Sequence, residues 1–242
     1  MRLLILSDIH ANLAAFEAVL ADCQGAWDQV WCLGDLVGYG AEPNECIALL
    51  REQPHLCLAG NHDWAALGRL DLGAFNSDAL DSVVWTREQL TAECRDYLEA
   101  RPPRLDLDGF TLAHASPRHP IWEYVLDLDT AAENFGHFEA PYCFIGHSHV
   151  PLIFLENAKE GALYQPAEFG ARFLLDDTRL LINPGSVGQP RDHDPRAAYG
   201  LLDTDGLVWE HRRVEYPVQL SQERIRAAGL PERNAYRLAV GW

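Results

Sequence analysis

The first sixty residues alternate short apolar runs with amphipathic segments, and this alternation restricts the possible folds more than any other feature. Apolar runs occupy residues 2–6, 29–33 and 55–59. Residues 11–23 carry apolar side chains at helical spacing, and residues 42–52 have a proline near their predicted first turn. Short, almost continuous apolar runs are typical of strands buried on both faces. The order strand, helix, strand, helix, strand predicts a parallel sheet of the α/β class.

The remainder of the chain is predicted to be helical first and rich in β-strands later. Residues 64–100 are mostly amphipathic with a break near residues 73–76, and Pro102 with Pro103 ends this helical pattern. Turn sequences such as Leu-Asp-Gly-Phe then separate strand-like segments, which predict an antiparallel or mixed second sheet. The predicted strands are residues 104–107, 110–114, 141–145, 152–155, 171–175, 179–182, 197–203 and 206–214.

No linker rich in Pro, Gly or Ser, no charge block and no internal repeat divides the chain. We therefore expect residues 1–242 to form one domain. Within it, residues 64–100 are expected to be a helical region near the rim of the site, and residues 215–242 a peripheral C-terminal segment. In that last segment a helical pattern is visible only at residues 221–229.

Composition and charge exclude several kinds of partner. The chain has 242 residues, 48% of them hydrophobic, which is enough for a sizeable core. Its formal net charge of -17 repels nucleic-acid phosphates and anionic membranes, so we expect neither long nucleic acids nor membranes as partners. A short oligonucleotide stays compatible with this charge. An anionic substrate needs a local positive centre, such as bound cations.

The six cysteines indicate where the protein works. None forms a Cys-x-x-Cys pair, which argues against a structural zinc cluster and favours buried free thiols. No basic segment followed by an apolar one indicates a secretory signal, and no apolar run approaches the roughly 20 residues that span a bilayer. These features together predict a cytoplasmic protein.

Five polar clusters each follow a predicted strand, and in open α/β sheets functional groups gather beyond the carboxyl ends of strands. We therefore expect one site assembled from distant parts of the chain. Carboxylate, amide and imidazole ligands suit Mn²⁺, Fe or Zn²⁺ at five or six coordination. The clusters are Asp8 with His10, Gly34 with Asp35, residues 60–63 (Gly-Asn-His-Asp), His114, and residues 145–149 (Ile-Gly-His-Ser-His).

These clusters, in this order, resemble the calcineurin-like metallophosphoesterases over residues 7–149. Residues 183–192 (NPGSVGQPRD) resemble the small bacterial and archaeal phosphodiesterase-like branch of that superfamily. The resemblance implies a four-layer α/β/β/α sandwich with two mixed β-sheets and a site for two divalent metal ions. It implies that one ion is held by Asp8, His10, Asp35 and His149. It implies that the other is held by Asp35, Asn61, His114 and His147.

Asp35 would then bridge two ions, which we expect to be Mn²⁺ or Fe, with Zn²⁺ also possible. Such ions share a bridging hydroxide that attacks phosphorus in line. The resemblance places His62 outside the metal shell, where it binds the phosphoryl oxygens or protonates the leaving alkoxide. The predicted function is a metal-dependent phosphoesterase that acts on a small phosphorylated substrate, preferably a phosphodiester or a small nucleotide.

Several alternatives stay open. They are a phosphomonoesterase, a dinucleoside polyphosphate hydrolase, a metal-dependent nuclease and a non-catalytic scaffold of the same fold. The scaffold is disfavoured because His62 and every ligand position are intact. One departure from the family also matters, because after Asp35 the chain continues Leu-Val-Gly-Tyr-Gly. Protein serine/threonine phosphatases of the superfamily carry Asp-Arg-Gly there, so the missing arginine argues against a protein phosphatase.

Two further residues are candidate substrate contacts. Asn12 either touches the phosphate or caps the helix that follows it. Arg191 either clamps a phosphate oxygen with its planar guanidinium or pairs with Asp192 or Asp194 on the surface.

The other polar and aromatic residues near the clusters receive weaker expectations. Asp63 is expected to orient or cap the next helix. Residues 64–100 and 115–128 are expected to form the rim that selects the substrate, and Arg118 and His119 are minor candidates within it. The histidines that we do not expect to bind metal are His55, His137, His193 and His211. The aromatic residues that we expect to pack rather than to stack on bases are Trp64, Phe75, Trp85 and Trp122.

Overall fold

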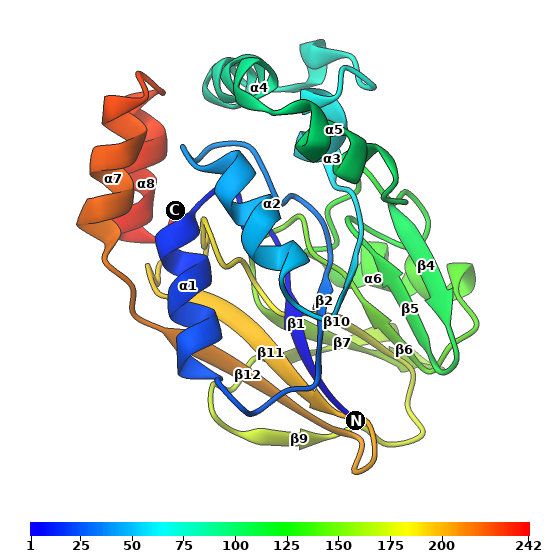
Figure 1. The fold of residues 1–242 in the computed structure, drawn as a ribbon. Coiled ribbons are helices and arrows are strands. Elements are labelled where there is room, and N and C mark those ends of the chain that lie inside the picture. The colour runs from blue at the N-terminus through cyan, green and yellow to red at the C-terminus, as the bar shows by residue number, and fades with distance from the viewer.

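The computed structural model describes residues 1–242 and contains two six-stranded β-sheets with helices on their outer faces (Figure 1). The strands are β1 (Arg2–Leu6), β2 (Gln29–Cys32), β3 (His55–Cys57), β4 (Arg104–Leu107), β5 (Phe110–Ala113), β6 (Tyr142–Phe144), β7 (Leu152–Asn157), β8 (Gly161–Pro166), β9 (Arg172–Leu174), β10 (Leu180–Asn183), β11 (Ala197–Asp203) and β12 (Val208–Val214). The α-helices are α1 (Leu13–Asp22), α2 (Pro43–Arg51), α3 (Asn61–Ala66), α4 (Ser77–Gln89), α5 (Ala92–Glu99), α6 (Leu128–Asn134), α7 (Val218–Ala227) and α8 (Glu232–Val240). Two short 3₁₀ helices are η1 (Leu72–Ala74) and η2 (Phe135–His137).

Both sheets mix parallel and antiparallel pairs. The first has the order β3-β2-β1-β11-β12-β9, and its three N-terminal strands are parallel, as predicted. The C-terminal strands β11 and β12 extend it in antiparallel register. The second sheet has the order β4-β5-β6-β10-β7-β8, in which β5, β6 and β10 are parallel. The strands of the second half were expected to form a second sheet, but three of them, β9, β11 and β12, join the first sheet instead.

Strand β1 packs against the layers on both faces of its sheet. Its side chains alternate: Leu4 and Leu6 join a core with residues of α1 and α2, while Leu3 and Ile5 join the core between the two sheets. All four are fully buried, and each such side chain contributes about 1.5–3 kcal/mol of burial free energy. A third core packs α6 against the outer face of the second sheet. The predicted four-layer α/β/β/α sandwich with two mixed sheets is confirmed.

The predicted elements agree with the observed ones except in three places. All eleven predicted strands are present within a few residues of their expected bounds, and the break predicted near residues 73–76 lies at η1. Strand β8 was not predicted, because it lies at a sheet edge and ends in a proline, which weakens the strand pattern. Helices α6 and α8 were also missed. Helix α6 has only seven residues, too few for a clear helical period.

The helices are distributed unequally around the sheets. In Figure 1, α1 and α2 lie in front of β1 and β2, and α3, α4 and α5 gather at the end toward which β1 runs. Helices α7 and α8 pack together, with α7 against α1. All six cysteines are buried free thiols, as predicted. No helix is both long enough and apolar enough to cross a membrane.

Candidate metal centre

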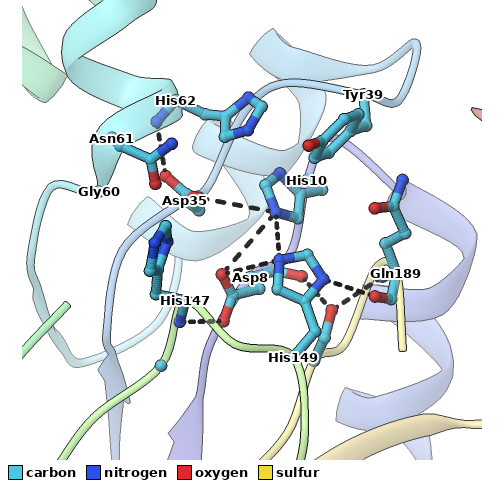
Figure 2. A network of polar contacts seen from close by, with 12 residues as sticks. Asp8, His10, Asp35, Tyr39, Gly60, Asn61, His62, His147, His149 and Gln189 are labelled. Atoms are coloured by element: carbon cyan, nitrogen blue, oxygen red, sulfur yellow. Dashed lines mark hydrogen bonds and ion pairs between the residues drawn. The ribbon is translucent and has the colours of Figure 1, made fainter. Parts of the chain in front are cut away.

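The structure brings all seven predicted metal ligands into one cluster at the carboxyl ends of the strands. Figure 2 shows Asp8, His10, Asp35, Asn61, His147 and His149. Asp8 and His10 follow β1, Asp35 follows β2, and Asn61 opens α3 after β3. The remaining three follow strands of the second sheet: His114 follows β5, and His147 and His149 follow β6. None of the seven is more than 3% exposed. The cluster therefore lies where the two sheets meet.

The backbone fixes the tautomer of three of these histidines. The Nδ1 atoms of His10, His114 and His149 lie 3.0, 2.9 and 2.6 Å from the carbonyl oxygens of Val37, Leu33 and Gln189. Because a carbonyl oxygen can only accept, each Nδ1 donates its proton and each Nε2 keeps a lone pair. A second-shell carbonyl on the other ring nitrogen is the usual arrangement of a metal-bound histidine.

The lone pairs so defined point at one another and at carboxylates. His10 Nε2 lies 3.1 Å from His149 Nε2, and neither can donate to the other. His149 Nε2 lies 3.3 Å from Asp8 Oδ1, and His114 Nε2 lies 3.5 Å from Asp35 Oδ2. Acceptors this close repel one another unless a cation lies among them. The donor set therefore fits bound metal ions.

Two atoms without partners support the same conclusion. Asp8 Oδ1 and His147 Nε2 are enclosed and make no hydrogen bond within the protein. The other oxygen of Asp8 accepts from the backbone N–H of His147 at 3.0 Å. A buried carboxylate oxygen and a buried ring nitrogen without partners are costly in an apolar interior. Metal coordination would satisfy both atoms.

Asp35 occupies the central position. Its Oδ1 accepts from the backbone N–H of His62 at 2.8 Å. Its Oδ2 lies 3.6 Å from His10 Nε2 and 3.5 Å from His114 Nε2, so one carboxylate faces both histidine groups. Asp35 belongs to two sets of three residues whose donor atoms lie within 4.8 Å of one another, one with His10 and His62 and one with His114 and His147. This position suits the bridging role that the resemblance implies.

Electrostatics set the protonation of the cluster. Burial holds the pKa of His10, His114 and His147 below its usual value, which favours the neutral form that a metal ion requires. Burial acts to raise the pKa of Asp8, but the contact with His149 holds it well below its usual range. Burial raises the pKa of Asp35 well above its usual value, and repulsion from neighbouring carboxylates adds to the effect. Bound cations would reverse that repulsion.

Five of the seven predicted ligands adopt the left-handed backbone conformation, which side chains disfavour. The φ angles are 54° at Asp8, 50° at His10, 50° at Asp35, 63° at His147 and 60° at His149. Each such residue costs on the order of 1–2 kcal/mol. Hydrogen bonds between the loops hold this strain, including His10 N–H to the Asp35 carbonyl at 2.9 Å. Strain of this kind collects at functional sites, where it fixes the direction of side chains.

Glycines let the loops approach the cluster. A Cβ atom at Gly60 would lie 2.1 Å from Asp35 Oδ1, so only glycine fits beside that carboxylate. A Cβ atom at Gly38 would lie 2.4 Å from His62 Nδ1, and the φ angle of +91° at Gly38 also requires glycine. The Gly-Asp, Gly-Asn-His-Asp and Gly-Tyr-Gly sequences thus serve side-chain placement as well as chain turns.

His62 lies beside the cluster at the second position of α3. Its ring lies 4.9 Å from that of His10 and 4.4 Å from that of Tyr39. It also belongs to a possible ligand group with His10 and Asp35. That His62 does not coordinate a metal therefore stays a prediction. Asp63 orients this turn, because its two oxygens accept from the backbone N–H groups of Gly60 at 2.9 Å and Val37 at 3.1 Å.

Arg191 lies at the site and does not form the alternative surface ion pair with Asp192 or Asp194. It lines a cavity together with Asp35 and His62. Its guanidinium donates to Gln189 Oε1 at 2.9 Å and to the Tyr39 hydroxyl at 3.3 Å, and it forms no ion pair. Asp192 and Asp194 instead pair with Arg213 and Arg196. The charge of Arg191 is therefore free to act on a ligand in the cavity.

Asn12 is occupied by structural contacts. Its side-chain oxygen accepts from the backbone N–H of Ala15 at 3.3 Å, which caps α1, and from the Ser221 hydroxyl at 2.7 Å. Its amide nitrogen donates to the Gly188 carbonyl at 2.9 Å. The helix-capping alternative is what the structure shows. The predicted contact between Asn12 and substrate has no geometric support here.

Arg118 and His119 also have structural partners. The Arg118 guanidinium pairs with Glu123 and Glu133, and the backbone N–H of His119 donates to the Ser116 hydroxyl at 2.9 Å. The remaining histidines lie outside the ligand groups. His211 donates to the Asn183 carbonyl, for example.

Other residues complete the cavity, and all of them except Tyr39 lie in the segments 64–100 and 115–128 that were expected to form the rim. Tyr39, Asn76 and Tyr124 line it, and Tyr124 stacks on His147 with ring centres 4.1 Å apart. Phe75 and Trp122, which were expected to serve packing, also line it. Tyr39 could have been suspected from its position between two glycines four residues after Asp35. The aromatic pair had no comparable signal in the sequence.

Comparisons with known proteins agree with this architecture. A model of the calcineurin-like phosphoesterase superfamily domain matches residues 1–206. The crystal structure of a metallophosphoesterase from Sphaerobacter thermophilus is 47% identical with a TM-score of 0.92, covering 100% of this chain and 99% of that one. The uncharacterized protein MJ0912 of Methanocaldococcus jannaschii is 39% identical over 244 residues, which are 98% of this chain and 97% of that protein.

A more distant relative has a named activity. The symmetrical bis(5'-nucleosyl)-tetraphosphatase of Glaesserella parasuis is 26% identical over 137 residues, which are 53% of this chain and 49% of that enzyme. The family match covers most of the chain, and the cluster lies within the matched residues. The chain therefore belongs to the calcineurin-like phosphoesterase superfamily and is a phosphoric ester hydrolase.

Proposed function

We propose that this hydrolase cleaves a phosphodiester or a small nucleotide with two divalent cations bound at the candidate metal centre. The proposal rests on one observation, which is the buried cluster of histidine nitrogens and carboxylate oxygens around Asp8 and Asp35. The Nε2 lone pairs of His10, His114 and His149 all face these carboxylates at 3.3 to 3.8 Å. Divalent cations among these acceptors would remove their mutual repulsion.

The ligand assignment follows the two sides of Asp35. Asp8, His10 and His149 would hold one cation on the side of β1, and Asn61, His114 and His147 would hold the other. Asp35 would contact both. When bound, two such cations supply an activated water and the positive charge that offsets the developing charge on a phosphoryl group. That charge also answers how a protein of net charge -17 can bind an anionic substrate.

The remaining roles belong to side chains beside the cations. His62 reaches the cavity, where its ring can donate to a phosphoryl oxygen or deliver a proton to the leaving oxygen. Arg191 is the cation of the cavity wall and would hold a phosphate oxygen that points away from the metals. The Tyr39 hydroxyl accepts from Arg191 and keeps the guanidinium beside that wall.

The small number of positively charged side chains in the cavity favours diesters. A monoester dianion has more negative charge to stabilise than a diester monoanion. Arg191 is the one arginine that lines this cavity, and the cavity contains no lysine. We therefore expect simple phosphodiesters to be cleaved at least as well as monoesters, and phosphoproteins to be poor substrates. A clear preference for phosphoserine peptides, measured as kcat/KM with the same metal, would contradict this expectation.

A hydrolysis screen tests the proposal directly. The purified protein is stripped with a chelator and reloaded separately with Mn²⁺, Fe²⁺, Zn²⁺ or Mg²⁺. Each form is then offered a diester, a monoester and a dinucleoside polyphosphate, the last because of the distant tetraphosphatase relative. We expect diester hydrolysis that requires reloading. Absence of hydrolysis with every metal and substrate would favour the non-catalytic scaffold.

A further inference from the structure

The cavity above the candidate metal centre has an aromatic wall. Phe75, Trp122 and Tyr124 line it together with His62 and His147. Trp122 is 38% exposed and Tyr124 is 48% exposed, although both are large rings. Single exposed aromatic residues are ordinary on protein surfaces, but here they gather at the opening of one polar site. We call Phe75, Trp122 and Tyr124 the aromatic rim.

The aromatic rim is in direct contact with His62 and with the candidate metal ligand His147. Phe75 lies edge-on to His62 with ring centres 5.2 Å apart, and Trp122 lies edge-on to Phe75 at 5.1 Å. Tyr124 stacks on His147 with an angle of 21° between the ring planes. Rings thus extend without interruption from the candidate metal ligands to solvent. A group attached to the bound phosphate would meet their exposed faces.

Hydrogen bonds to Glu123 hold the segment that carries Trp122 and Tyr124. Glu123 lies between Trp122 and Tyr124 in the chain, and its carboxylate accepts from Ser116 and Asn134 at 2.7 Å each. The Arg118 guanidinium also donates to it, with Nε at 3.0 Å. This network explains why Arg118 and the segment after His114 are polar. It holds the two rings in place before any ligand arrives, which lowers the entropic cost of binding.

The wall also offers a polar contact near its rings. Asn76 lines the same cavity and caps α4 with its side-chain oxygen, which accepts from Ala79 N–H at 3.0 Å. Its amide nitrogen makes no hydrogen bond within the protein. A flat ligand with hydrogen-bond acceptors on its edge can therefore stack on the rings and accept from Asn76. An alkyl chain would use the rings but not the amide.

We propose that the aromatic rim binds the nucleobase of a nucleotide whose phosphate lies at the candidate metal centre. The inference rests on the proposed function, which it makes narrower: the ester carries a nucleoside on at least one side. Aromatic rings stack on every base, so the rim selects for the presence of a base more than for its identity.

Binding of matched ligands tests the proposal without any turnover. The metal-loaded protein is titrated calorimetrically with two analogues in which a methylene group replaces the ester oxygen, so that neither is hydrolysed. One is the analogue of adenosine 5'-monophosphate, and the other is the analogue of ribose 5-phosphate. We expect the base-bearing ligand to bind about ten-fold more tightly, within the range of a single stacked base. Trp122→Ala should remove most of that difference, and Trp122→Phe should keep most of it.

Controls separate stacking from general damage. Trp242→Ala removes another tryptophan that is 48% exposed and lies outside the cavity, and it should change neither affinity. Equal affinity of the two analogues for the wild-type protein would overturn the inference even if the protein hydrolyses diesters. An alkyl phosphonate that binds as tightly as the nucleotide analogue would also overturn it. Base-dependent binding without any hydrolysis would instead leave the inference standing and remove the proposed function.

Discussion

The buried metal-centre residues and the aromatic rim meet at one cavity but are built in opposite ways. The seven predicted ligands are at most 3% exposed, and five of them hold the strained left-handed backbone conformation. The rim residues Trp122 and Tyr124 are 38% and 48% exposed, and neither has a positive φ angle. The difference shows that the candidate ligands are held by strained, cross-connected loops, whereas the rim residues lie on unstrained and partly exposed segments.

The largest effect is expected at the centre of the buried cluster. Asp35→Asn removes one negative charge from the carboxylate that faces both histidine groups, so both cations should bind more weakly and hydrolysis should fall below detection. Elemental analysis and a diester assay measure the two consequences. If the variant kept two tightly bound metals, Asp35 would not be the bridging ligand.

A substitution of His62 tests whether this residue is a metal ligand or acts on the substrate from outside the metal shell. His62→Ala should retain both metals and lose roughly 10²–10⁴-fold in kcat, the usual size of a general acid–base contribution. The loss should be smaller for a nitrophenolate leaving group, which needs little protonation. Loss of a metal from this variant would show that His62 is a ligand.

Gly38 tests whether backbone strain near the site serves placement. In Gly38→Ala the new Cβ atom would lie 2.4 Å from His62 Nδ1 and displace the ring. A displacement of about 1 Å can cost on the order of 10²-fold in rate, so we expect a loss of that size in kcat with metal content unchanged.

A matched glycine provides the control for Gly38. Gly109 has a φ angle of +77° and nothing within 4 Å of its Cβ position. Gly109→Ala should therefore cost about 1–2 kcal/mol of stability and leave the rate unchanged. Similar kinetics for the two variants would mean that Gly38 acts only through the backbone.

Arg191 lies between the two regions, and its removal should have a smaller effect. Arg191→Ala deletes a hydrogen bond to a charged oxygen, worth about 1.5–3 kcal/mol, so we expect KM to rise roughly 10–100-fold. If the contact is equal in the ground and transition states, kcat stays nearly unchanged. A fall in kcat at constant KM would place Arg191 in transition-state stabilisation instead.

The smallest effect on activity is expected outside both regions, at His211. This side chain is 2% exposed; its Nδ1 accepts from Trp209 at 3.0 Å, and burial lowers its pKa from 6.5 to about 4. Below pH 6.5 the unfolded chain therefore binds a proton that the folded chain does not. Stability is lost as the pH falls from about 6.5 toward 4, by up to about 3 kcal/mol.

Urea unfolding of the metal-free protein between pH 8 and pH 4 measures this contribution. His211→Gln should be less stable at pH 8 and should lose less of its remaining stability on acidification than the wild-type protein. Parallel pH profiles for the two proteins would show that His211 does not carry the predicted linkage.

Much of the buried cluster could be predicted because its signals are local. Asp8 and His10 follow a continuous apolar run that only a buried strand explains, and the same holds for Asp35 after β2. Arg191 was located correctly as a candidate but not decided, since Asp192 and Asp194 are closer in sequence than the Tyr39 hydroxyl that it contacts. Asn12 was likewise ambiguous, because a capping side chain and a phosphate ligand look alike in sequence.

The sequence by itself determined the α/β class, the order of the strands along the chain and the positions of the polar clusters, because each depends on residues within one short segment. Only the tertiary structure decided which sheet each strand joins, which ring nitrogens keep lone pairs, and that Phe75, Trp122 and Tyr124 share one cavity. Their contacts join residues up to 47 positions apart, as between Phe75 and Trp122. Aromatic side chains pack in cores and line cavities with the same chemistry, so only their final exposure distinguishes the two roles.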